Sequence, residues 1–127
     1  MINIYIVLAI LFIHWFADFV CQSDWQAQNK SKNNSALLEH TSIYSVIWYF
    51  PMIVVFLFPS LSLEKAIVNS MAFVSITFVC HTIQDYFTSR LNSKLWEQKK
   101  VHNFFVSVGL DQFGHYVQLL LTYYLLA

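Results

Sequence analysis

The last residues of the sequence, DQFGHYVQLLLTYYLLA (111–127), combine an apolar run with two ionisable side chains at its start. Asp111 and His115 are four residues apart, so in a helix both side chains project from the same face. The residues that follow them are apolar enough to contact lipid. We therefore expect a helix that suits a membrane but carries a polar face at its beginning.

The same two residue types recur at the same spacing twice more. HWFAD carries His14 and Asp18, and HTIQD carries His81 and Asp85. An aspartate at the centre of a membrane helix costs about 3 kcal/mol on insertion scales, so such groups are normally paired and turned away from lipid. The three pairs therefore predict polar faces that meet inside a helix bundle.

The composition is that of an integral membrane protein. Of 127 residues, 57% are hydrophobic and only 11% are charged, compared with about 25% charged in a typical soluble domain. The length suits one domain, so we assign residues 1–127 to a single integral membrane domain. The formal net charge of zero provides no overall basic field, which argues against a nucleic-acid partner.

Four segments have the apolarity and length of membrane helices, which predicts an all-α fold, a four-helix transmembrane bundle. They are residues 2–22, 35–58, 62–90 and 110–127. The first has no basic region and no small-residue cleavage site, so we expect a retained helix and not a signal peptide. Pro51 is expected to kink the second. VHNFFVSVG (101–109) is expected to form a short interfacial helix before the last span.

The basic residues predict the orientation of the bundle. The polar loop SDWQAQNKSKNNS (23–35), which has no apolar periodicity, and the linker after the third segment carry most of them, whereas the turn between the second and third segments carries only Lys65. The residues in the two basic loops are Lys30, Lys32, Arg90, Lys94, Lys99 and Lys100. Such loops stay in the cytoplasm, so both termini are predicted on the outer side.

This topology places seven histidine and aspartate side chains at a similar depth, toward the cytoplasmic face. They are His14, Asp18, His40, His81, Asp85, Asp111 and His115. Mixed imidazole and carboxylate sets bind zinc, iron or manganese, and seven candidates exceed the needs of one four-coordinate ion. We therefore predict one or two divalent metal ions as the cofactor. Two ions ~3.5 to 4 Å apart can activate a water and clamp the oxygens of a phosphodiester or ester.

A general base is also expected among the aspartates. Asp18 and Asp85 are candidates within the cluster, and Asp24, just outside the first helix, is a third.

Side chains near the cluster are candidates for binding a substrate. Lys30 and Arg90 are first of all charges that set the topology, and the same side chains can hold an anionic lipid headgroup or a substrate phosphate. Gln22 and Gln112 are candidate hydrogen-bond partners beside the cluster.

The motifs resemble one family of small membrane proteins. HWFADFVCQSDWQAQNK (14–30), then His40, HTIQDYFTSR (81–90) and DQFGH (111–115) are similar to small bacterial and phage-encoded integral membrane proteins of unknown function, with the motifs HxxxDFxxQxD, HxxxD and DQxxH. The resemblance spans nearly the whole chain and implies a multi-pass protein of the bacterial inner (cytoplasmic) membrane, surrounded by lipids. A looser likeness is to inner-membrane proteins described as metal-dependent hydrolases.

Two functions from different classes remain open. The first is a membrane-embedded, metal-dependent hydrolase that cleaves a phosphoester or ester, including that of a lipid, near the cytoplasmic face. The second is a non-catalytic, phage-derived effector that binds a host membrane protein or forms a homo-oligomer, with the His and Asp pairs only fixing the bundle. Proton or ion conduction is disfavoured, because IYIVLAILF (4–12) and MIVVFLF (52–58) provide no polar path to the outer face.

Overall fold

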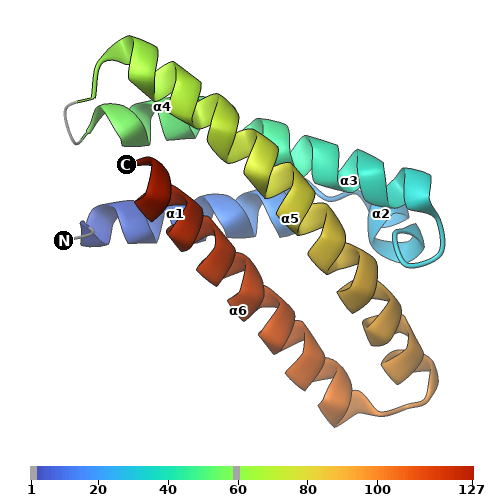
Figure 1. The fold of residues 1–127 in the computed structure, drawn as a ribbon. Helices are drawn as coiled ribbons and strands as arrows, with labels where there is room; N and C mark the ends of the chain where they lie inside the picture. Colours follow the sequence, from blue (N-terminus) through green and yellow to red (C-terminus); the bar gives the residue numbers. More distant parts are fainter. Residues whose placement is uncertain (1–2, 59–60) are drawn as a thin grey trace.

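The computed structural model describes residues 3–58 and 61–127, and every regular element in these ranges is a helix. In chain order they are α1 (Ile4–Trp15), η1 (Phe16–Val20), α2 (Asp24–Asn29), α3 (Asn34–Ile47), α4 (Tyr49–Leu57), α5 (Leu63–Glu97) and α6 (Val101–Leu126). The predicted all-α class is therefore confirmed. α5 and α6 form a long antiparallel hairpin, and α1, α3 and α4 pack against it (Figure 1). Ile2, the predicted start of the first helix, lies outside the described residues.

The first predicted span ends in a widened helical turn. α1 passes at Phe16 into the π-helix η1, and the N–H of Cys21 donates to the carbonyl of Phe16, five residues back, at 3.0 Å. π-Helices are rare, mostly single turns within α-helices, and frequently lie at functional sites. This one carries Asp18, which is buried, so the insertion helps to set where that carboxylate lies.

The second predicted span is divided into α3 and α4 at Trp48. Pro51 has no N–H to donate to the carbonyl of Ile47, and its ring clashes with that carbonyl. Just before the proline, the N–H of Trp48 donates to the carbonyl of Ser45 at 3.2 Å. This carbonyl is three residues back and not four, so the turn is tighter than an α-helical one. The kink predicted for Pro51 therefore appears as a break in the turn that precedes it.

α5 and α6 are both longer than predicted. α5 continues through most of the expected linker to Glu97, and the turn that follows is short, with Lys99 at a left-handed φ of 57°. Residues 101–109, expected to form a separate interfacial helix, are instead the first part of the uninterrupted α6. The rings of Trp96 and Phe104, with centroids 5.1 Å apart, hold this part of α6 against the end of α5.

The segment predicted as a polar loop, residues 23–35, contains the short helix α2, which its lack of apolar periodicity did not indicate. α2 begins with a capping box in which the Ser23 hydroxyl accepts from the N–H of Gln26 at 3.2 Å, and the Gln26 side chain accepts from the N–H of Ser23 at 3.1 Å. The pattern S-x-x-Q in SDWQ is the sequence signal for this motif. α2 ends at Asn29, and its C-cap residue, Lys30, points toward the polar interior.

The exterior is apolar and much of the interior is polar. Phe12, Phe113 and Leu121 are more than half exposed, at 61%, 63% and 55%, whereas histidine and aspartate side chains are buried. Among the described residues, Asn34–Leu57 and Leu63–Glu97 are long and apolar enough to cross a bilayer, and Ile4–Val20 is a shorter apolar stretch. Large apolar side chains are thus exposed while ionisable ones are buried, which agrees with these candidate spans.

An apolar core fills the end of the bundle where α1 begins and α6 ends (Figure 1). Trp48, Phe56, Phe73 and Leu119 are fully buried there, and Asn69 donates to the carbonyl of Leu126 at 2.6 Å, which ties the start of α5 to the end of α6. The polar side chains lie further along the bundle, toward the α5–α6 turn.

Candidate metal centre

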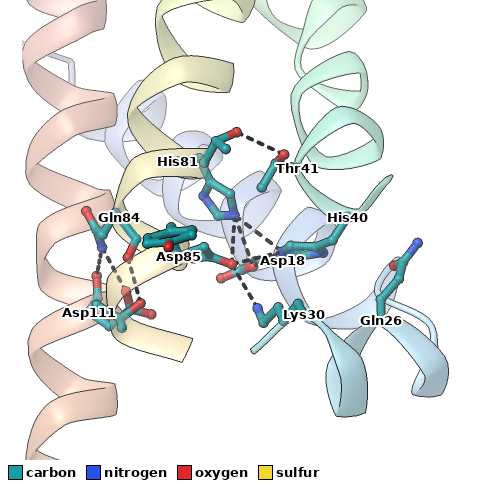
Figure 2. Close-up of polar contacts among 12 residues, drawn as sticks. Asp18, Gln26, Lys30, His40, Thr41, His81, Gln84, Asp85 and Asp111 are labelled. Carbon is teal, nitrogen blue, oxygen red and sulfur yellow. Dashed lines mark hydrogen bonds and ion pairs between the residues drawn. The ribbon is translucent and has the colours of Figure 1, made fainter. Parts of the chain in front are cut away.

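Buried histidine and aspartate side chains from η1, α3, α5 and α6 meet inside the bundle. Figure 2 shows the imidazoles of His40 and His81 turned toward the carboxylates of Asp18 and Asp85. The polar faces predicted for the helices point inward. The buried polar residues are, on α5, Ser70, Thr77, His81 and Asp85, and on α6, His115 and Thr122.

Four of these side chains form a compact group. Asp18, His40, His81 and Asp85 each offer a ligand atom, and the four atoms lie within 4.8 Å of one another. His40 Nε2 is 3.1 Å from Asp18 Oδ1 and 3.4 Å from Asp85 Oδ2. His81 Nε2 is 3.6 Å from each of these oxygens. Ligand atoms bound to one ion at about 2.1 Å are about 3.4 Å apart in tetrahedral geometry, and adjacent ones are about 3.0 Å apart in octahedral geometry, so the spacing fits a single metal ion.

A second group shares one carboxylate with the first. It consists of Asp85, Asp111 and His115. His115 Nε2 lies 3.2 Å from Asp85 Oδ1 and 3.4 Å from Asp111 Oδ1. The two oxygens of Asp85 thus face different groups, Oδ2 toward the first and Oδ1 toward the second.

The two groups are also linked by a contact between imidazoles. Nδ1 of His81 and Nδ1 of His115 are 3.1 Å apart and buried. Because one nitrogen must donate and the other must accept, a single proton lies between the two rings. The tautomers of His81 and His115 are therefore coupled.

His14 lies outside both groups, and its ring nitrogens contact a tyrosine hydroxyl and a glutamine amide instead. Its Nδ1 is 2.7 Å from the Tyr44 hydroxyl, and its Nε2 is 2.8 Å from Oε1 of Gln112. The amide nitrogen of Gln112 donates to Asp18 Oδ2 and Asp111 Oδ2, at 3.3 Å each. Oε1 must therefore accept the proton of His14 Nε2, which leaves Nδ1 to accept from Tyr44.

Lys30 brings a positive charge to the cluster from α2. Its Nζ lies 2.9 Å from Asp85 Oδ2, and Figure 2 shows the ammonium pointing at the carboxylates. Burial lowers the pKa of Lys30, but the carboxylates of Asp85 and Asp18 raise it by more, so its pKa ends above the ordinary value. The side chain stays protonated throughout the physiological range.

Three residues predicted to serve the site are not brought to the cluster. Asp24 is exposed in the first turn of α2. Arg90 points away, with Nη2 donating to Asn34 Oδ1 at 2.8 Å and its guanidinium 3.7 Å above the ring of Tyr86. Gln22 buries Oε1 without a hydrogen-bond partner among the described residues. Asp24 and Arg90 lie on helix faces turned to other surroundings, which a linear spacing does not reveal.

The sequence interpretation missed two residues that support the cluster. The ring of Tyr44 stacks on His81, with centroids 3.8 Å apart and planes 13° apart. Its position four residues after His40 on α3 was the available signal. Gly114 is the other residue, since a Cβ there would lie 2.9 Å from Oε1 of Gln84, whose amide nitrogen donates to Asp111 Oδ1 at 3.0 Å.

One protein family matches this chain. The family model described as "Protein of unknown function (DUF3307)" matches residues 6–127. No curated protein and no solved structure matches the chain. The matched range includes every residue of both groups, so the cluster lies within the part of the chain that the family model covers.

Proposed function

The chain belongs to the DUF3307 family, whose function is unknown, and from its site we propose a membrane-embedded hydrolase of a phosphoester or ester that uses one divalent metal ion. The observation that carries the proposal is the convergence of Asp18, His40, His81 and Asp85 on one buried point. Two carboxylates in a largely apolar bundle are costly, and a bound cation offsets that cost.

The membrane location is supported by the distribution of side chains. Exposed phenylalanine and leucine residues surround an interior that holds histidines and aspartates. Lys94, Lys99 and Lys100 lie at the α5–α6 turn, and basic segments favour the cytoplasmic side. We therefore propose a multi-pass protein of the bacterial inner membrane, a bundle of four spans with both termini outside and the cluster in the cytoplasmic half.

The shared proton between His81 and His115 favours one ion over two. If His81 binds a metal through Nε2, its Nδ1 carries the proton and donates to Nδ1 of His115. Because Nδ1 of His115 then accepts, a neutral His115 carries its proton on Nε2. That N–H can donate to Asp85 Oδ1, and the protonated nitrogen cannot bind a metal ion. The group Asp18, His40, His81 and Asp85 is accordingly assigned the ion, and Asp111 and His115 are assigned to its surroundings.

The ligand set suits iron or manganese in a catalytic role. Two imidazoles and two carboxylates bind zinc, iron or manganese. Four protein ligands close a tetrahedral zinc site, whereas a six-coordinate ion keeps two positions for water and a substrate oxygen. An open position is what hydrolysis requires.

The reaction needs a proton acceptor beside the ion. When bound, a divalent ion polarises the substrate oxygen and makes water a better nucleophile. The water oxygen bonds to phosphorus or carbon as the ester bond breaks, one water proton passes to a base, and the leaving oxygen takes up a proton. Asp111 fits the base because its side chain is 11% exposed, compared with 5% for Asp18 and 3% for Asp85.

The function is tested with purified protein and a chromogenic phosphodiester, in the presence of manganese or a chelator. Hydrolysis that stops on chelation, returns with manganese and is absent in His81→Gln supports the proposal. Arg90→Gln is the matched control, since its side chain lies outside the cluster, and it should retain activity. Hydrolysis that persists in His81→Gln contradicts the proposal.

The non-catalytic effector is the second candidate, and the position of Lys30 favours it. Its ammonium, 2.9 Å from Asp85 Oδ2, supplies positive charge to the carboxylates without a metal. In that case the protein contains no metal, and cluster variants lose stability and partner binding together.

A further inference from the structure

A pocket of about 440 Å³ lies beside the cluster, between the end of α2, the last turns of α5 and the start of α6. Lys30 lines it and also reaches Asp85 Oδ2, 2.9 Å from its Nζ. Ser89 lines it one helical turn after Asp85, on the same face of α5. The pocket thus adjoins the cluster through Lys30 and Ser89.

Two buried polar atoms at the pocket have no partner among the described residues. They are the hydroxyl of Ser89, a residue only 8% exposed, and the side-chain oxygen of Asn92. Leaving such groups unpaired costs about 1–3 kcal/mol each. With the Lys30 ammonium beside them, they form the lining that a phosphate with a neighbouring hydroxyl would satisfy, the phosphate accepting from Lys30 and Ser89.

The other end of the pocket is aromatic and open. Trp96 and Phe105 are 58% and 63% exposed, and the ring of Phe104 lies between them, its centroid 5.1 Å from that of Trp96 and 5.3 Å from that of Phe105. These side chains stand at the basic α5–α6 turn. Aromatic residues beside lysines are typical of the level of the lipid headgroups.

We propose that this pocket binds an anionic phospholipid whose phosphate accepts from Lys30 and Ser89, whose headgroup hydroxyl donates to Oδ1 of Asn92, and whose acyl chain begins along Trp96, Phe104 and Phe105. The polar end, the adjoining cluster and the aromatic exit together fit an amphiphile better than a soluble ester. The assignment of this lipid as the substrate rests on the proposed function, whereas its binding does not.

Binding is tested by tryptophan fluorescence of the detergent-solubilised protein, titrated with phosphatidylglycerol, an anionic lipid with headgroup hydroxyls, that carries brominated acyl chains. Bromine quenches nearby indoles, so Trp96 reports on the pocket, and Trp96→Phe identifies its share of the signal. We expect saturable quenching that brominated phosphatidylcholine does not reproduce at the same concentration. Equal quenching by the two lipids would show a nonspecific lipid contact and overturn the proposal.

Two variants with matched controls locate the phosphate. Ser89→Ala removes a hydroxyl that has no hydrogen-bond partner in the described part of the chain, so the fold is retained while binding weakens about tenfold. Ser75→Ala, on an exposed part of α5, leaves binding unchanged.

Lys30→Gln abolishes the preference for the anionic lipid, whereas Lys32→Gln, outside the pocket, does not. Unchanged binding in Ser89→Ala and Lys30→Gln would refute the assignment.

Competition by inorganic phosphate separates a lipid from a free anion. We expect it to displace the lipid only at a large excess, because it gains nothing from the aromatic end. Displacement at equal concentration would make free phosphate the ligand and overturn the lipid assignment. Metal content measured on the same samples separates the two proposals. Selective lipid binding without bound metal would support the lipid pocket and contradict the metal-dependent hydrolase. Bound metal without selective lipid binding would support the metal centre and contradict the lipid pocket.

Discussion

The hydroxyl of Tyr44 lies 2.7 Å from Nδ1 of His14, and both residues are fully buried. Tyr44→Phe removes the donor and leaves a buried ring nitrogen unpaired, while the stacking of the ring on His81 can persist. We expect the free energy of unfolding in mixed micelles to fall by about 1–3 kcal/mol, with metal content unchanged. Tyr124→Phe, at a position 66% exposed, is the control and should have no effect. Loss of metal in Tyr44→Phe would argue against a purely supporting role.

The two glycines of α6 offer a matched pair of substitutions. Gly109→Ala adds a methyl group with nothing within 4 Å, so it should stabilise the helix by about 0.5–1 kcal/mol. Gly114→Ala places its Cβ 2.9 Å from Oε1 of Gln84 and pushes that amide away from Asp111. We expect no gain in stability and a loss of hydrolysis if Asp111 is the base. Thermal unfolding and activity measured on both variants check this, and equal behaviour of the two would contradict the close approach.

Acid should release the metal. Imidazole and carboxylate ligands bind a metal only when they are deprotonated, so protons compete with the ion. With His40, His81 and two carboxylates as ligands, the fraction of metal retained after dialysis should fall as the pH is lowered from about 7.5 to about 4. Metal retained unchanged through this range would point to ligands other than histidine.

The orientation can be tested with a reporter that is active only in the cytoplasm. Inserted in the turn at residues 98–100 it should be active, and fused after Ala127 it should be inactive. Lysines flanking the turn favour this result. The opposite pattern would place the cluster in the outer half of the membrane.

Much of the architecture could be predicted from the sequence because long apolar runs and paired polar residues are local signals. The inward direction of His81, Asp85 and His115 follows from helical periodicity alone. The break occurs at Trp48 and not at Pro51 because the proline ring clashes with the carbonyl of Ile47, four residues earlier. The continuity of α6 through residues 101–109 depends on contact with the end of α5, which no local pattern shows.

The candidate site was predicted in composition but not in detail. Spacing brought together the ligand types, yet His14 is placed outside the groups by Gln112 and Tyr44, which lie far from it in the sequence. Arg90 and Asp24 were expected near the cluster and are turned elsewhere by the rotation of their helices. Such distinctions depend on side-chain contacts between helices.

The most direct test of the metal centre is elemental analysis by mass spectrometry of wild-type protein, His81→Gln and His115→Gln, each purified in detergent and monodisperse. A one-ion centre with His81 as a ligand predicts about one equivalent of iron or manganese per wild-type chain, its loss in His81→Gln and its retention in His115→Gln, because the shared proton leaves Nε2 of His115 unable to bind the ion. Two equivalents in the wild type, equal loss in both variants, or no metal in any sample would contradict it.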